Sequence, residues 1–85
     1  MPSTWRKVPF TKGRSYRVRK SFKALRAVFQ EGEILRYDND AYSLYDACTG
    51  FFFFDSEGKI RSWDVRDDQS IDVWPELFEL DEKPA

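Results

Sequence analysis

Residues 50–65 read GFFFFDSEGKIRSWDV, four phenylalanines that run into a turn and a second alternating segment that leaves it. Asp55 and Gly58 occupy the first and fourth positions of the turn, where a type I turn favours Asp and Gly. Both flanks are rich in aromatic and β-branched residues, which fill a pleated and half-buried surface. The segment therefore predicts a β-hairpin at the centre of a small β-rich domain.

The turn also predicts how the two strands pair. A type I turn followed by a bulge at Gly58 fixes the register of the hairpin. The predicted cross-strand pairs are Phe54 with Ile60, Phe53 with Arg61, Phe52 with Ser62, and Phe51 with Trp63.

The two faces of the predicted hairpin differ in character. The better core face holds Phe51, Phe53, Trp63 and Val65, with Arg61 as its polar member. The other face carries a smaller apolar patch, and two interpretations of that patch stay open. Either the 22–29 segment or the C-terminal turn covers it, or it contacts a peptide or a second copy of the chain. The patch consists of Phe52, Phe54 and Ile60, beside Ser62 and Asp64.

Length and composition predict one folded domain. The chain has 85 residues, and a chain of this size buries roughly 60–65% of its unfolded surface. Eight Phe, four Tyr and three Trp make up 18% of the residues. Since each buried aromatic side chain removes roughly 150–250 Å² from water, a handful of them can build the core.

Cysteine use and hydropathy predict a cytoplasmic protein. Cys48 is the single cysteine, so no internal disulfide can form, which fits a reducing compartment. The first residues lack the apolar run of a secretory signal. No segment approaches the ~20 apolar residues of a membrane span.

Charge is divided along the chain. Residues 1–30 hold nine of the 14 Lys and Arg and no acid, whereas all 15 carboxylates lie between Glu31 and Glu82. One interpretation is a basic face for phosphate or another anion. The favoured one is internal neutralisation by the acidic end of the chain, because the net charge is only −1. That acidic end contains Asp72, Glu76, Glu79, Asp81 and Glu82.

The remaining segments follow from periodicity and turn signals. Residues 1–13 form an arm interrupted by prolines and Gly13, with Trp5 and Phe10 packed against the core. Strands are predicted at 15–20, 33–37, 41–45 and 71–73, and a polar turn at 38–40. A short helix, or an irregular loop that carries one helical turn, is predicted between Ser21 and Gly32. A helical turn is predicted at 74–80, where Pro75 suits the first helical position.

Residue types that carry catalysis are missing. The chain has no histidine, so the commonest general base and metal ligand is absent, and Cys48 has no partner for nucleophilic catalysis. Zinc would need four Cys or His ligands. Asp38-Asn39-Asp40 departs from a calcium loop at the fifth and sixth positions. We therefore expect a protein that is not an enzyme and holds no metal or cofactor.

The order of residues resembles small SH3-like barrels, in particular a family of uncharacterised bacterial single-domain proteins. The resemblance covers about residues 13–80 and includes Gly13-x-x-Tyr16-x-Val18, Phe22, Phe29, Gly32-Glu33-x-Leu35, Tyr42, the aromatic hairpin and Trp63. It implies a mainly β fold, a five-stranded antiparallel SH3-like barrel at 14–80 with one or two short helical turns and a tail at 81–85. It implies no assigned activity.

Two functional hypotheses follow. The first is a non-catalytic module, monomeric or homodimeric, that binds a protein or peptide through exposed aromatics; the acids Asp38, Asp40 and Asp46 nearby favour a basic partner. Its candidate residues are Tyr42, Tyr45, Phe52 and Phe54. The alternative is nucleic-acid or polyanion binding, with aromatics as stacking surfaces. Its candidate residues are Arg14, Arg17, Arg19, Lys20 and Lys23.

Overall fold

The central hairpin of the computed structural model has the predicted pairing. β5 (Cys48–Phe54) and β6 (Ile60–Arg66) are antiparallel, and all four predicted cross-strand pairs are present. Gly58 has a φ of +79°, a conformation that favours glycine, and its N–H donates to the Asp55 carbonyl at 2.9 Å. The structure describes residues 4–81; residues 1–3 of the predicted arm and 82–85 of the predicted tail lie outside the described residues.

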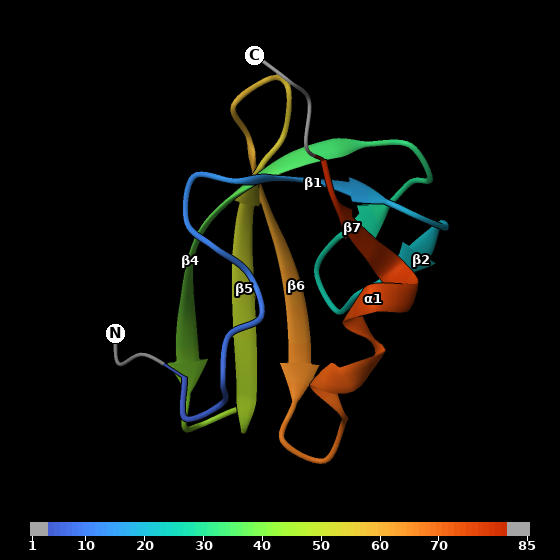
Figure 1. Cartoon of the computed structure of the whole chain (residues 1–85). Helices are drawn as coiled ribbons and strands as arrows, with labels where there is room; N and C mark the ends of the chain where they lie inside the picture. Colours follow the sequence, from blue (N-terminus) through green and yellow to red (C-terminus); the bar gives the residue numbers. More distant parts are fainter. Residues whose placement is uncertain (1–3, 82–85) are drawn as a thin grey trace.

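The hairpin belongs to a sheet of five antiparallel strands (Figure 1). Its other members are β1 (Ser15–Val18), β4 (Ile34–Ser43) and β7 (Phe78–Leu80), and the strand order is β6-β5-β4-β1-β7. β2 (Phe22–Lys23) and β3 (Val28–Phe29) form a separate two-stranded sheet. The fold is thus mainly β, as predicted.

The predicted five-stranded closed barrel needs correction. The described part of the chain has seven strands, not five, and the sheet is not closed, because β6 and β7 stand at its two margins. β2 and β3 come from the segment predicted as a helix, and β7 from the segment predicted as a helical turn. The predicted strands at 33–37 and 41–45 belong to one strand, β4.

That helix prediction, between Ser21 and Gly32, is wrong for a physical reason. Phe22 and Phe29 pair across β2 and β3 and stack with ring centroids 4.8 Å apart, whereas the helical interpretation placed them on one helix face. The Ser21 hydroxyl accepts a hydrogen bond from the Glu31 N–H across the hairpin at 3.0 Å, and so does not act as a helix cap.

Two further segment predictions are wrong. The polar residues 38–40 do not form a turn: β4 continues through them, with a bulge between Tyr37 and Asn39. Residues 71–73 form the 3-10 helix η1 (Ile71–Val73), not a strand, because the Ser70 hydroxyl caps it by accepting the Asp72 N–H. The following α1 (Trp74–Leu77) confirms the first part of the helical turn predicted at 74–80, with Pro near its start, but residues 78–80 form β7.

The core is an aromatic cluster on the inner face of the sheet. Phe10 from the arm is buried at its centre, as predicted, whereas Trp5 is 63% exposed and the prediction that it packs against the core is wrong. The buried members are Phe10, Tyr16, Val18, Phe29, Leu35, Tyr37, Phe51, Phe53, Trp63, Val65 and Phe78.

Candidate functional site

One end of the sheet exposes large apolar side chains where β4 turns into β5. Tyr45 is 98% exposed and Leu44 is 84% exposed, the two highest values among the exposed large hydrophobics. The turn that carries them is braced by Ser43, whose hydroxyl donates to the Asp46 carboxylate at 3.0 Å and accepts the Asp46 N–H at 3.2 Å. The local hydrogen bonds therefore hold two apolar side chains out toward solvent.

A single carboxylate holds two further aromatic residues at this end. The Trp5 indole N–H donates to one oxygen of Asp67 at 3.1 Å, and the Tyr42 hydroxyl donates to the other at 2.6 Å. This hydrogen bond to Asp67 raises the pKa of the Tyr42 hydroxyl, so the group stays protonated as a donor. We call Trp5, Tyr42, Leu44 and Tyr45 the aromatic end.

The Arg6 side chain packs against the Trp5 indole ring. Its guanidinium lies 4.7 Å from the Trp5 ring centroid and donates to the carbonyls of Arg66 and Gln69, each at 2.7 Å. The Trp5 ring is therefore exposed and held in place at the same time. An aromatic ring already held in one position loses little entropy when a partner covers it.

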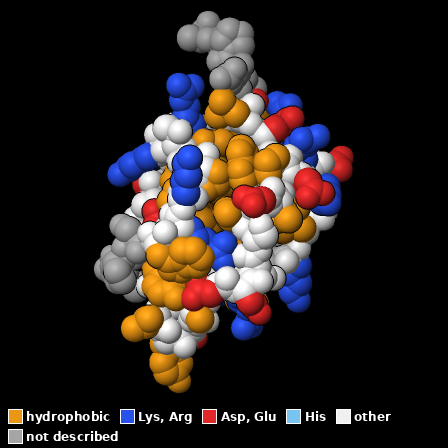
Figure 2. Space-filling model, turned by 60° about the horizontal axis from the view of Figure 1, so that its bottom comes forward, with side chains coloured by type: hydrophobic (Ala, Val, Ile, Leu, Met, Phe, Trp, Pro, Cys, Tyr) orange, Lys and Arg blue, Asp and Glu red, His pale blue; other side chains and the backbone are white. Residues whose placement is uncertain are grey.

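Figure 2 brings this end of the molecule forward and shows hydrophobic side chains exposed on it, with charged side chains between and around them. Four carboxylates lie on the strands and turns that form this end, those of Asp40, Asp46, Asp67 and Asp68, against the cations Arg6 and Arg66. Arg26, which lines the same pocket as Asp46, is paired with Asp64. The surroundings of the aromatic end are therefore acidic in balance.

The structure does not bring all four predicted aromatic residues together. Tyr42 and Tyr45 share the aromatic end, but Phe52 lies on the opposite face of the sheet, because its pairing with Asn39 sets it out of phase with Tyr42. Phe54 lies further along β5, with the Arg36 guanidinium 5.5 Å from its ring centroid. Both phenylalanines are half-buried.

The hairpin's second face is covered in part by the 22–29 segment. Arg26 reaches from the β2–β3 turn and binds the Asp64 carboxylate at 2.6 and 3.0 Å, while donating to Ser62 at 3.1 Å. Ser62 and Asp64 are buried, whereas Ile60 is 65% exposed. Beside Arg26 a shallow pocket of about 400 Å³ extends over Cys48 and Phe52 to the edge of β4.

Sequence reasoning missed Trp5, Leu44 and Asp67 as parts of this surface. Trp5 was assigned to the core because an exposed tryptophan is uncommon. The available signal was its neighbour Arg6, a cation able to cover an indole in solvent. Asp67 gave no local signal, since its two partners lie 62 and 25 residues away.

The predicted basic residues divide into two groups. Arg17 pairs with Asp81 at 3.0 Å and Glu79 at 3.6 Å, because β1 lies beside β7 in the sheet. Arg19 donates to the Pro75 carbonyl at 2.8 Å. The other three are exposed and form no ion pair with the residues that the structure describes: Arg14, Lys20 and Lys23.

Cys48, the single cysteine of the chain, is buried. Burial raises the pKa of the Cys48 thiol, which keeps it a poor nucleophile. Within residues 4–81 no group of three or more His, Cys, Asp or Glu is placed to hold a metal ion. In the same part of the chain no helix is both long and apolar enough to cross a membrane.

Comparison with known proteins identifies a structural neighbour. An integron cassette protein from the mobile metagenome of Vibrio cholerae has a TM-score of 0.69 to this chain and 19% sequence identity, over 85% of this chain and 86% of that one. At this identity the likeness shows the fold alone. No protein-family model matches the sequence, and no curated protein matches it.

Proposed function

We propose that this chain is a non-catalytic interaction module that binds a protein or peptide through the aromatic end. The observation that carries the proposal is the pair Leu44 and Tyr45, which project into solvent beside Trp5 and Tyr42 held on Asp67. Exposing such side chains costs hydrophobic free energy, which a partner that covers them recovers. Tyr and Trp are also the residue types that dominate binding energy at interfaces.

We also propose that the domain is an SH3-like fold with an open sheet. Its support is the strand order β6-β5-β4-β1-β7, with a long connection that carries β2 and β3 between β1 and β4, and helical turns directly before β7. A bacterial origin, a cytoplasmic location and the choice between monomer and homodimer stay predictions.

Selection of peptides from a random displayed library tests the proposed function. The full chain is expected to enrich a defined set of peptides, and replacing both Leu44→Ser and Tyr45→Ser is expected to weaken their binding at least about tenfold. Since both side chains are exposed, the double variant should keep the parent's unfolding midpoint. Fluorescence anisotropy of the enriched peptides gives the affinities.

Ile60→Ser is the matched control, because Ile60 is also an exposed large hydrophobic but lies at the far end of β6. It should bind the selected peptides as the parent does. Equal affinities of all three chains for the peptides, or no enrichment at all, would contradict the proposed surface.

The polyanion alternative predicts a different result. Arg14, Lys20 and Lys23 are available, but Arg17 and Arg19 are engaged by β7 and by α1. We therefore expect no measurable binding to mixed single- and double-stranded oligonucleotides at low salt. Binding that weakens steeply with added salt, and weakens again in a Lys20→Gln, Lys23→Gln variant, would favour the alternative.

A further inference from the structure

Among the residues that the structure describes, no strand pairs with the outer half of β4 on the side away from β5, so this half is an open edge beside the aromatic end. β4 pairs with β1 only through residues 34–36, whereas its pairing with β5 extends to Ser43. Figure 1 shows this second half of β4 at the margin of the sheet, with the N-terminal arm in front of it. An edge of this kind presents backbone groups that an extended chain can pair with.

The direction of these backbone groups follows from the ladder. The Tyr37 N–H donates to the Arg14 carbonyl, and its own carbonyl accepts the Gly13 N–H, so both groups point away from β5. Direction alternates along an antiparallel strand, and the bulge after Tyr37 adds one residue. The N–H and C=O groups of Asp40 and Tyr42 therefore point out of the open edge.

The Thr4 N–H donates to the Asp40 carboxylate at 2.7 Å, but in residues 4–81 no backbone group outside the sheet ladders bonds to the backbone N–H or C=O of Asp40 or Tyr42. A strand laid along this edge would project alternate side chains to opposite faces. One set would lie beside Tyr42 and Trp5. The other would lie over the small residues Ala41 and Ser43, at the rim of the shallow pocket that Asp46 also lines.

The charges around the open edge of β4 favour one kind of binding partner. Asp40 and Asp67 stand on one face, near Arg6, and Asp46 stands on the other, where Arg66 and Arg26, which is paired with Asp64, line the same pocket. A second copy of this chain paired antiparallel through the same edge would bring Asp38, Asp40 and Asp46 of both copies to one seam, and gathering like charges there is unfavourable. A strand with Lys or Arg side chains would instead meet the carboxylates of Asp40 and Asp67 on one face and that of Asp46, beside Arg66, on the other.

We propose that the open edge of β4 binds an extended basic segment of another protein by adding it as a strand to the sheet. This inference rests on the proposed function and specifies it: the backbone of Asp40 and Tyr42 supplies the pairing, the aromatic end covers the apolar side chains, and Asp40 and Asp46 select basic ones.

A capped peptide of three Lys-Val repeats tests the inference against the full isotope-labelled chain. In the free protein the Asp40 and Tyr42 amides should exchange with solvent faster than those of Asn39 and Ala41, which face β5. Saturating peptide should slow the Asp40 and Tyr42 amides at least about tenfold and leave the other two unchanged. The Glu-Val counterpart of the peptide should bind at least about tenfold more weakly.

Backbone methylation separates strand addition from contact by side chains. Methylating the peptide nitrogens at one set of alternate residues should weaken binding at least about tenfold, and methylating the other set should change it little. An Asp40→Asn, Asp46→Asn variant should bind less tightly with a smaller salt dependence, and Glu57→Gln, at the far hairpin, should match the parent.

Several results would overturn the inference. Equal effects of both methylations, or unchanged exchange at Asp40 and Tyr42 in a bound complex, would leave the aromatic end as a binding surface but remove the strand pairing. Equal binding of the Glu-Val peptide, or no binding of the Lys-Val peptide, would remove the basic partner. A dimer whose free chain already protects both amides would make a second copy the occupant. The proposed function fails separately, through the Leu44 and Tyr45 substitutions.

Discussion

Phe10→Ala is expected to destabilise the protein by about 3–5 kcal/mol, the range for removing a buried phenylalanine ring. A domain of this size has a total stability of about 4–13 kcal/mol, so the variant loses a large share of it. Urea unfolding followed by tryptophan fluorescence measures the loss. The expected size follows from the position of the ring.

Phe10 is the hub of the aromatic core. Its ring centroid lies between 5.1 and 6.0 Å from those of seven other aromatic rings, drawn from the sheet and from α1. Most of these contacts are edge-to-face, the arrangement that the ring quadrupole favours. The arm is anchored next to it, because the Thr11 N–H donates to the Tyr16 hydroxyl at 2.8 Å. The arm therefore supplies the centre of the core.

Two comparison variants keep this prediction testable if Phe10→Ala does not fold. Phe10→Leu retains most of the apolar volume and should cost less, about 1–2 kcal/mol. Tyr45→Ala, at a fully exposed position, should change the free energy of unfolding by less than about 0.5 kcal/mol. A Phe10→Ala variant as stable as Tyr45→Ala would mean that the arm does not complete the core.

The hairpin was predictable because its determinants lie within 16 consecutive residues. Asp55 accepts the N–H groups of Glu57 and Lys59, each at 2.9 Å, and Gly58 supplies the positive φ, so a local sequence fixes the turn and with it the register. The alternation of the flanks then separates the core face from the outer face without further information.

The predictions that failed concern segments whose structure depends on distant residues. Residues 38–40 have turn composition, but β5 offers a long partner that keeps them in the ladder. Residues 22–29 have helical spacing but form the β2–β3 hairpin. Its turn is bound through Arg26 to Asp64, 38 residues away, and Arg61 donates to the Val28 carbonyl in β3. The aromatic end was half predicted for the same reason: Tyr42 and Tyr45 lie three residues apart, at the end of β4 and in the turn after it, whereas Trp5 reaches this end through Asp67.

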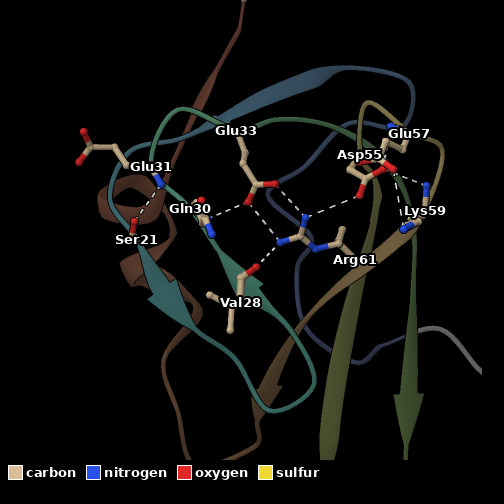
Figure 3. Close-up of polar contacts among 9 residues, drawn as sticks. All are labelled: Ser21, Val28, Gln30, Glu31, Glu33, Asp55, Glu57, Lys59 and Arg61. Atoms are coloured by element: carbon tan, nitrogen blue, oxygen red, sulfur yellow. Dashed lines mark hydrogen bonds and ion pairs between the residues drawn. The ribbon is translucent and has the colours of Figure 1, made fainter.

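Arg61 connects three parts of the chain that are far apart in sequence (Figure 3). Its guanidinium donates to the two carboxylate oxygens of Glu33 at 2.9 and 3.2 Å and to the Val28 carbonyl, and lies 3.7 Å from the Asp55 carboxylate. The same group lies 5.1 Å from the Phe29 ring centroid. It is the polar residue that the sequence placed on the core face, and these contacts explain how that face tolerates a charge.

Arg61→Met is therefore expected to destabilise the protein by about 2–4 kcal/mol at neutral pH, because it leaves a partly buried Glu33 carboxylate without its charged partner and with only the hydrogen bond from the Gln30 N–H. Lys59→Met is the matched control: its pair with Glu57 is exposed, at 3.8 Å, and its loss should cost less than about 0.5 kcal/mol. Urea unfolding at pH 7 compares the two variants. Equal, small effects would show that Arg61 is a surface residue in energetic terms.

The pH dependence of the difference in unfolding free energy between the parent and Arg61→Met identifies the cause of that difference. The hydrogen bond from Arg61 lowers the pKa of Glu33 from its usual 4.5. A carboxyl with a lowered folded-state pKa stabilises the protein above its unfolded pKa, and that contribution is lost as the pH falls through the lowered folded value. The gap in unfolding free energy between the parent and Arg61→Met should thus be full above about pH 5 and shrink below about pH 4. In a Glu33→Gln background, the difference in unfolding free energy between chains with and without Arg61→Met should be smaller and nearly independent of pH over that window. If this difference keeps its size and its pH profile without Glu33, the effect of Arg61 comes from its contacts with Phe29 and Asp55.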